Sequence, residues 1–396
     1  MIRPVAVEII SVLLLEHDAK TLLASHAIPV PKGMLVGKGD AYGSPSFSAP
    51  WMVKGQVPVG GRGKAGAVKK ASDTQSLTRN LDGIMGLRVH GHVVKECLVE
   101  QALPSVGEHY ISFSLDPETP GVAIVLSSEG GMDVEDLPPE NLAIGRSPLS
   151  ETEIKAEITH LTESLPFQHR KTIRDAALAL ATVFLSSDLT LLEINPLLSC
   201  ADGTWVAADA KIIFDESALD RQPFMEKLLS DRQQAYASDV FKRTEGFDFI
   251  VLDPDGEIGL ITTGAGLTMQ VVDELADQNV TAYNFCDIRS GMMRGDPARL
   301  IRVLSHFATE SRIKAILVNI FAGITNLGEF SQLLIKAVET ADGPNVPIVA
   351  RLVGNAADEA AAILNQSTLP FVVESDLDAA IVKVAALAKD KEAANA

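Results

Sequence analysis

The chain has 396 residues, of which 46% are hydrophobic and 29 are glycine, and its formal net charge is -18. This length allows two or three domains with substantial cores, and the charge disfavours a nucleic-acid binder, because affinity for the phosphate backbone depends on Lys and Arg. Three widely spaced cysteines fit neither a disulfide framework nor a zinc site, so a reducing compartment such as the cytoplasm is expected.

The amino-terminal segment predicts a helix rather than a membrane anchor. The apolar run at residues 9–15 is too short to span a bilayer and lacks a secretory cleavage site, so no membrane contact is expected. Residues 16–26 have the pattern of an amphipathic helix, which Pro29 and Pro31 terminate. Residues 35–57 mix Gly, Ser and Pro and are typical of loops and short strands.

A glycine-rich loop at residues 58–66 is flanked by Lys54 and contains Arg62 and Lys64. A flexible backbone with cations suits a polyphosphate, since the chain can approach it closely and offset its charge. The spacing is not that of a Walker loop. The alternative is a basic surface loop with solvated lysines.

The middle of the amino-terminal half alternates strands and helices. Residues 94–100 and 122–127 predict strands, whereas residues 151–160 and 171–184 predict helices. The second helix leads into the strand at residues 192–197.

That strand carries Glu193 and Asn195, which project to the same face because they are two residues apart. An Asn195 amide oxygen beside an Asp209 carboxylate would supply two oxygen ligands for a hard divalent cation, leaving Glu193 as a neighbouring acid. Alternatively, the strand presents Glu and Asn to solvent and ends at Pro196.

The polar stretch at residues 217–244 is interpreted as a linker, and the chain beyond residue 247 changes in character. Short apolar strands alternate with helical patterns there, which is typical of a doubly wound parallel sheet. The expected strands are residues 249–252, 258–262, 282–285, 314–320 and 347–352, and the expected helices are residues 267–277, 297–309, 328–341 and 356–365.

Two expected strand ends carry turns with polar groups, at residues 262–266 and 319–326. Ligands of such sheets bind at the carboxyl ends of the strands. A glycine turn that opens a helix offers free backbone N–H groups and a positive dipole end, which suit a carboxylate or phosphate. Alternatively, these glycines only allow the strand and helix to pack closely.

The glycine-rich loop, Leu192 to Leu197, Asp209 to Lys211 and the two turns occur in an order that resembles the β subunit of succinyl-CoA synthetase, from about Glu16 to about Ala385. The resemblance implies an ATP-grasp region of two subdomains at residues 1–245. A flavodoxin-like CoA-ligase domain, an α/β doubly wound parallel sheet, would follow at residues 246–396. The implied activity is that of an ADP-forming acid–CoA ligase.

The resemblance also assigns roles to residues at matching positions. Lys54 and the triplet Gly61, Arg62 and Gly63 match nucleotide-phosphate contacts, and Arg62 would also offset charge during transfer. Glu100, Leu103 and Glu108 fall where the family contacts adenine and ribose, Leu103 through its backbone. Asn195 and Asp209 match the magnesium ligands, and Glu193 matches the acid that faces the phosphohistidine.

In that family ATP or GTP with Mg²⁺ phosphorylates a histidine on a separate α subunit. The phosphoryl group then activates a carboxylic acid for attack by CoA, which binds on the α subunit. None of the eight histidines here lies in a small glycine-rich loop that would make it reachable. An α partner, in an αβ or α2β2 assembly, is therefore expected.

The acid-binding side departs from the family pattern. Thr263 replaces an Asn before the Gly264 turn, and Arg289 and Ser290 replace glycines. In the later loop, Gly323 and Ile324 are followed by Thr325, whose hydroxyl replaces the Val of the family pattern. An arginine fork could bind a second carboxylate or a sulfonate. A small dianion is expected, such as succinate, malate, itaconate or a sulfonated or sulfinated short acid. Alternatively, Arg289 points to solvent or pairs with Asp287 or Asp296.

Other functions remain open from the sequence. A stand-alone ATP-grasp carboxylate–amine ligase would need no carboxyl-terminal domain of this kind. A citryl-CoA synthetase or ATP-citrate lyase-type subunit would explain the added polar groups, although no lyase module is present. A nucleotide-sensing subunit without turnover would not need the intact Glu193, Asn195 and Asp209 set.

Overall fold

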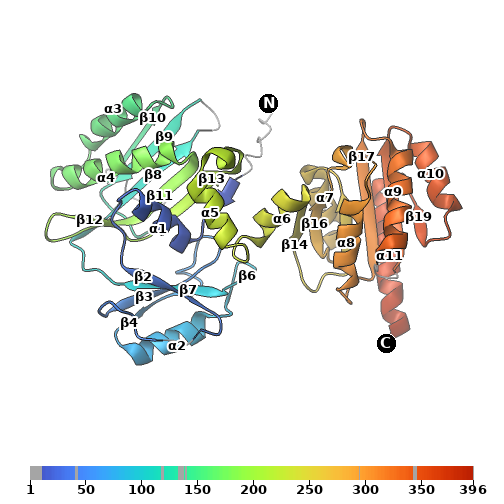
Figure 1. The fold of residues 1–396 in the computed structure, drawn as a ribbon, viewed down its shortest axis with the longest axis horizontal. Helices are drawn as coiled ribbons and strands as arrows, with labels where there is room; N and C mark the ends of the chain where they lie inside the picture. Colours follow the sequence, from blue (N-terminus) through green and yellow to red (C-terminus); the bar gives the residue numbers. More distant parts are fainter. Residues whose placement is uncertain are drawn as a thin grey trace. The chain divides into compact units, whose positions relative to one another are not determined.

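The computed structural model describes residues 11–40, 43–116, 120–132, 138, 141–293, 295–341 and 346–395. The chain forms two compact units, residues 1–231 and 232–396 (Figure 1). The segment predicted as a linker is largely helical, with η3 (Glu216–Arg221), α5 (Pro223–Asp231) and α6 (Ala237–Glu245). The two units divide between residues 231 and 232, within this segment, and α5 forms there because Met225, Leu228 and Leu229 recur at helical spacing and are buried. The domain boundary at 245/246 stays a prediction.

The larger sheet of the first unit is antiparallel and carries two helices, α3 (Glu151–Thr162) and α4 (Phe167–Ser186). The rings of Phe113 and Phe184 lie 5.9 Å apart where α4 packs on the sheet. The sheet order is β1 (Ser11–Leu13), β13 (Lys211–Asp215), β11 (Leu189–Ser199), β8 (Gly107–Leu115), β9 (Val122–Ser127) and β10 (Leu142–Ser147), with β12 (Trp205–Ala207) paired to β11.

The smaller sheet of the first unit is covered by α2 (Thr74–Ile84), whose Leu77, Leu81 and Ile84 are buried at helical spacing. Its order is β2 (Gly33–Gly37), β7 (Glu96–Gln101), β3 (Trp51–Gly55) and β4 (Val68–Ala71), and β5 (Arg88–Val89) and β6 (His92–Val93) form a separate hairpin. Helix α1 (Glu16–Ser25) precedes this sheet, and the glycine-rich loop joins β3 to β4.

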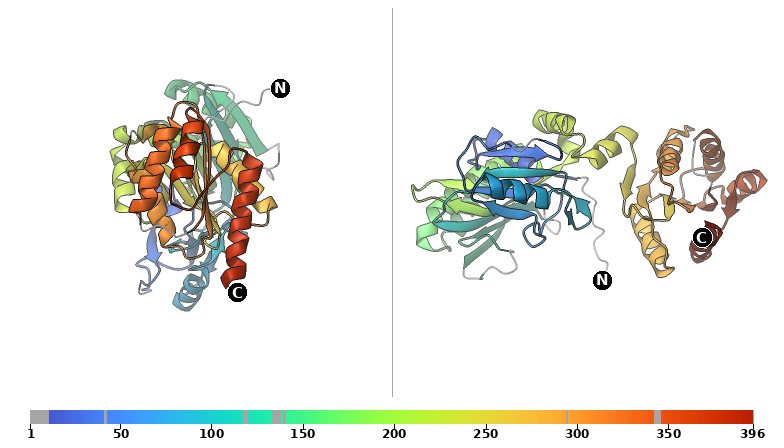
Figure 2. Two further views of the ribbon diagram at one scale, coloured as in Figure 1. Left: turned by 90° about the vertical axis from the view of Figure 1, so that its right-hand side faces the viewer. Right: turned by 90° about the horizontal axis from the view of Figure 1, so that it is seen from below.

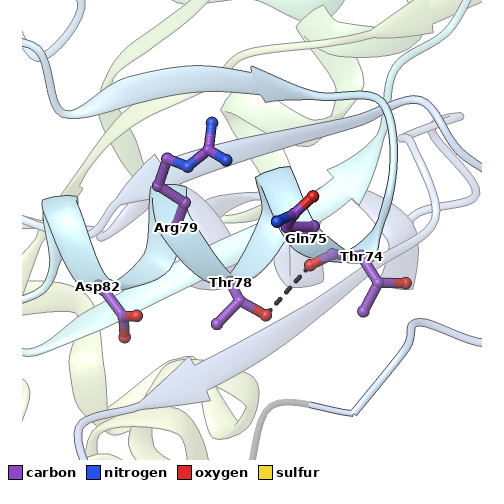
Figure 3. A pocket seen from close by; sticks show the side chains of 5 residues that line it. All are labelled: Thr74, Gln75, Thr78, Arg79 and Asp82. Atoms are coloured by element: carbon purple, nitrogen blue, oxygen red, sulfur yellow. Dashed lines mark hydrogen bonds between the residues drawn. The ribbon is translucent and has the colours of Figure 1, made fainter.

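A surface hollow on α2 is lined by Thr74, Gln75, Thr78, Arg79 and Asp82 (Figure 3). These side chains belong to the helix itself, and the hollow contains none of the predicted site residues.

The second unit is a doubly wound sheet, as predicted (Figure 2). Its order is β14 (Asp248–Val251), β16 (Asn284–Asp287), β15 (Ile258–Thr262), β17 (Ala315–Ala322), β18 (Ile348–Gly354) and β19 (Phe371–Val373), and only the edge strand β14 is antiparallel. One buried cluster unites the sheet with α8 (Ala298–Ala308), α9 (Leu327–Thr340) and α10 (Ala357–Gln366). A second unites it with α7 (Ala265–Asp277) and α11 (Leu377–Asn395).

Most predicted elements are present with small shifts. Strands β9 and β15 have the predicted bounds, whereas the strand expected at residues 282–285 begins at Asn284. Ala282 makes only an isolated bridge to Ile258. The Asn284 side chain then bonds both backbone groups of Leu260, which fixes the start of β16. None of the described helices is long and apolar enough to cross a bilayer.

Candidate functional site

Six charged side chains of the first unit form one cluster, here called the ion network, of which Glu16, Lys20, Lys54 and Glu100 are buried and Arg62 and Asp209 half-buried. Its acids and bases are equal in number, so its formal charges cancel. Its members come from α1, from β3, from the glycine-rich loop, from β7 and from the turn before β13: Glu16, Lys20, Lys54, Arg62, Glu100 and Asp209.

Two lysines of the network hold the same three partners. Lys54 Nζ donates to Glu16 Oε1 at 2.7 Å, to Glu100 Oε1 at 2.6 Å and to the Ala208 carbonyl at 2.8 Å. Lys20 Nζ donates to Glu16 Oε1 at 2.7 Å, to Glu100 Oε2 at 2.6 Å and to the Ala208 carbonyl at 2.7 Å. Because an ammonium has three donors, all donors of both lysines are used within the protein.

Arg62 connects this group to Asp209. Its Nη1 donates to Glu16 Oε2 at 2.6 Å, and its Nη2 lies 3.0 and 3.1 Å from the two Asp209 carboxylate oxygens. The loop that carries Arg62 turns at Gly61, whose φ of +72° favours glycine. The predicted phosphate-binding residues Lys54, Gly61 and Arg62 are thus brought together with Asp209, and Gly63 lies exposed in the same loop.

The charges of the network set the pKa values of its acids. Burial alone would raise the pKa of the Glu16 carboxyl, but Lys20, Lys54 and Arg62 together hold that pKa well below its usual range. Burial and the neighbouring Glu16 charge raise the pKa of Asp209, against the opposing effect of Lys54 and Arg62. Of Glu16 and Asp209, Asp209 is therefore the acid whose charged form the cations stabilise less.

Strand β11 presents the predicted metal ligand and acid on one face. Leu192 and Ile194 are buried while Glu193 and Asn195 are half-buried, so the predicted alternation is confirmed. Asn195 Oδ1 accepts from the Gly131 backbone N at 2.7 Å. The Ala208 backbone N donates to the Pro196 carbonyl at 3.1 Å, which holds the turn bearing Asp209 alongside this strand.

The oxygen atoms of Asn195 and Asp209 are of the type that Mg²⁺ binds, so the residues fit this metal. Among the described residues, no group of three or more His, Cys, Asp or Glu side chains could hold a metal ion. An ion at this position would therefore complete its coordination with substrate oxygens and water, as Mg²⁺ commonly does.

The predicted adenine and ribose contacts are spread over two sheets. Glu100 on β7 is buried in the ion network, whereas Glu108 on β8 is exposed and Leu103 lies half-buried in the connecting loop. The sequence interpretation missed Glu16 and Lys20. A signal was present, because these charged residues lie four apart on the side of the predicted helix that also carries Leu23.

The predicted acid-binding residues lie on three neighbouring loops of the second unit. Strand order β16, β15, β17 places the loops after these parallel strands side by side at one edge. Ser290 Oγ and Thr325 Oγ1 lie 3.1 Å apart and line a cavity of about 260 Å³ with Ile324. The other lining residues are Gly291, Met293, Gly295, Asn326, Glu329, Phe330 and Leu333.

Thr263 and Gly264 form the middle loop. The Thr263 hydroxyl is buried and has no hydrogen-bond partner among the described residues. Gly264, with φ of +87°, is the N-cap of α7, so this turn opens a helix as predicted. Gly323, in the loop after β17, is exposed.

Arg289 does not line this cavity. Its side chain points to the edge strand β14. Its Nη2 lies 2.9 Å from Asp248 Oδ2, and its backbone N donates to Asp287 Oδ1 at 3.2 Å. The sequence interpretation named Asp287 and Asp296 as possible guanidinium partners and missed Asp248. Antiparallel pairing of β14 with β16 sets Asp248 opposite Asp287 and thereby beside Arg289.

Residues 13–199 match the ATP-grasp domain family, and residues 261–385 match the CoA-ligase family. The chain is 31% identical over 390 residues to the β subunit of the ADP-forming succinate–CoA ligase of Ruthia magnifica subsp. Calyptogena magnifica, covering 94% of this chain and 99% of that one. The predicted order of an ATP-grasp domain and a CoA-ligase domain is confirmed.

Two solved structures share the fold. ATP citrate lyase from Methanothrix soehngenii, in complex with citrate and coenzyme A, is 17% identical with a TM-score of 0.70, covering 95% of this chain and 99% of that one. ATP citrate lyase from Methanosaeta concilii, in complex with (3S)-citryl-CoA, is 16% identical with a TM-score of 0.65, covering 92% and 96%.

Proposed function

This chain belongs to the family of the β subunit of ADP-forming succinate–CoA ligase, and from that premise we propose how it acts. It binds ATP with Mg²⁺, and the ATP phosphorylates a histidine of a partner α subunit. The phosphoryl group then activates a small dianionic acid for thioester formation with CoA, which binds on the partner. The ion network is the observation that carries this proposal.

The network supplies what phosphoryl transfer requires of a protein. Phosphoryl transfer depends on positioning and on offsetting negative charge, because little covalent chemistry is left to the enzyme. Arg62 pairs with Asp209, and Lys54 pairs with Glu16, which Arg62 also contacts, so two positive charges lie near the Asp209 carboxylate. Asn195 and Asp209 would hold a bound Mg²⁺, which would supply further positive charge to offset that of the phosphates.

Glu193 is proposed to face the phosphohistidine of the partner. It lies on β11 two residues before Asn195, on the same half-buried face, so it is next to the proposed metal ligand. A carboxylate there can accept the imidazolium proton and orient the ring during transfer.

Exposed apolar side chains support a partner-binding surface on the second unit. Ile324 is 96% exposed and Phe321 is 61% exposed, both at the carboxyl end of β17, and Met269 on α7 is 64% exposed. Strand β15, which precedes α7, neighbours β17, so these side chains come from the same edge of the sheet, and exposed apolar side chains at one edge are typical of an interface. An α subunit that supplies the histidine and the CoA site would cover this edge, in an αβ or α2β2 assembly.

The acid is proposed to bind at the three loops beneath that surface. The Ser290 and Thr325 hydroxyls line the cavity, whose volume of about 260 Å³ suits a small acid rather than a large one. Succinate, malate and short sulfonated acids have this size and charge.

To test the proposal, this chain is co-expressed with its α partner, and small di-acids and citrate are screened for CoA-dependent ADP release. Release with none of them would overturn it.

We propose that the Arg289 guanidinium leaves Asp248 when the acid binds and pairs with the acid instead. Arg289→Met is therefore expected to raise KM for the acid by about tenfold or more, while KM for ATP changes less than about twofold, because this pairing would contribute to binding only the acid. Steady-state kinetics with each substrate varied in turn check this. Asp248→Asn, which removes the partner of Arg289, is the matched control and should not raise KM for the acid. Equal losses for both substrates would contradict the assignment.

Thr263→Val is expected to raise KM for the acid by about three- to tenfold without lowering stability. The Thr263 hydroxyl is buried and has no partner in the described chain, so its removal leaves no protein group unpaired. Kinetics and thermal denaturation of the same variant separate the two effects. Thr262→Val is the contrasting variant, because the Thr262 hydroxyl bonds Thr268 and the Cys286 carbonyl, and it should lose stability. A stable Thr263→Val protein with unchanged KM would exclude this hydroxyl from the acid site.

A further inference from the structure

We propose that Lys20 is a positioning residue that keeps the Glu16 and Glu100 carboxylates neutralised when Lys54 turns from them toward a nucleotide phosphate. This inference rests on the proposed function, because it assumes that Lys54 contacts the nucleotide. Lys20 itself is 5% exposed and lies behind Glu16 on the same helix, one turn along, so it is not proposed to touch the nucleotide.

Lys54 has no free donor in this structure. Its three N–H groups bond Glu16, Glu100 and the Ala208 carbonyl. A phosphate contact therefore requires Lys54 to release at least one of these oxygens.

Releasing a buried carboxylate is costly unless another cation remains on it. Glu16 and Glu100 are 4% and 2% exposed, so water cannot replace a lost ion pair. Lys20 already donates to Glu16 Oε1, to Glu100 Oε2 and to the Ala208 carbonyl, which are the groups that Lys54 would leave.

Arg62 cannot replace Lys20 in neutralising Glu100. Its two Nη atoms hold Glu16 Oε2 and Asp209, whereas the two Glu100 oxygens are held by the ammonium groups, Oε1 by Lys54 and Oε2 by Lys20. Without Lys20, movement of Lys54 would leave Glu100 buried without the cations that hold it. Because Lys20 bonds the same three groups as Lys54, Lys54 can leave them at low energetic cost.

The test compares the dissociation constant of Mg·ATP with the thermal midpoint of the nucleotide-free protein, both on the full chain. Lys20→Met is expected to weaken Mg·ATP binding about 30-fold or more, because Lys54 then stays on the two carboxylates. Lys20→Arg, which keeps the charge, should recover most of this loss, to within about fivefold of the wild type. The matched control is Lys70→Met, at an exposed position of β4, which should bind as the wild type does.

The outcomes separate this inference from the proposed function. If wild-type protein binds Mg·ATP and Lys20→Met binds it equally well, whatever its thermal midpoint, Lys20 is only structural and the inference is overturned. If Lys20→Met does not fold, Lys20→Gln, which keeps a donor without the charge, should show the same weakened binding, and normal binding by it would overturn the inference. If wild-type protein does not bind Mg·ATP at all, the proposed function itself fails.

Discussion

The Glu193→Gln variant is expected to lose about 100-fold or more in kcat for CoA-dependent ADP release, while its affinity for Mg·ATP changes less than about threefold. A positioned carboxylate that assists proton transfer contributes about 10²–10⁴ in rate. Gln has nearly the same shape but cannot take up a proton. Glu193 lies opposite Ser112 on β8 and Lys211 on β13, so an isosteric change at this position should preserve the strand register.

The measurement is steady-state kinetics with the α partner, together with equilibrium Mg·ATP binding to the isolated variant. Glu163→Gln, at the exposed end of α3, is the control and should retain the wild-type rate. A variant that loses nucleotide affinity as strongly as it loses rate would show that Glu193 serves binding rather than transfer. A wild-type kcat in Glu193→Gln would show that Glu193 takes no part in proton transfer.

The Glu16→Gln variant is expected to lose about 3–5 kcal/mol in the free energy of unfolding of the first unit, the usual result of breaking a buried ion pair from one side. The Glu16 side chain is 1% exposed and accepts from Lys20, Lys54 and Arg62. Without its charge, the three cations share only Glu100 and Asp209, which leaves a net positive charge buried.

Urea denaturation followed by tryptophan fluorescence measures this loss in the relevant part of the chain. Trp51 and Trp205 are the only tryptophans, and both lie in the first unit. Glu153→Gln, on the exposed face of α3, should change the free energy of unfolding by less than about 0.5 kcal/mol. A loss below about 1 kcal/mol in Glu16→Gln would mean that the network is not the buried, mutually neutralising cluster described above.

Sequence patterns correctly predicted those features of the fold that are set by residues close together in the sequence. The alternation at Glu193 and Asn195 and the glycine turn at Gly264 are of this kind, and both are present. The polar composition of residues 217–244 indicated the segment in which the two units divide, but not its helix α5, because charged residues surround the buried Met225, Leu228 and Leu229 in the sequence.

Contacts between distant segments were not predictable from such patterns. Glu16 meets Lys54 and Arg62 only because α1, β3 and the glycine-rich loop pack together, and the pairs are 38 and 46 residues apart. Arg289 pairs with Asp248 because the edge strand β14 runs antiparallel, whereas the alternating pattern predicted parallel strands throughout. A charged pair on the apolar side of a helix, as at Glu16 and Lys20, is the one local sign of a buried network.

We propose that the reaction is divided between two chains, and one comparison tests this directly. The purified chain is assayed for Mg·ATP binding and for acyl-CoA formation, first alone and then with its α partner. We expect Mg-dependent nucleotide binding by the chain alone, no acyl-CoA from the chain alone, and acyl-CoA once the partner is added. Full-rate acyl-CoA formation by the chain alone, or no nucleotide binding with Mg²⁺ present, would contradict the claim.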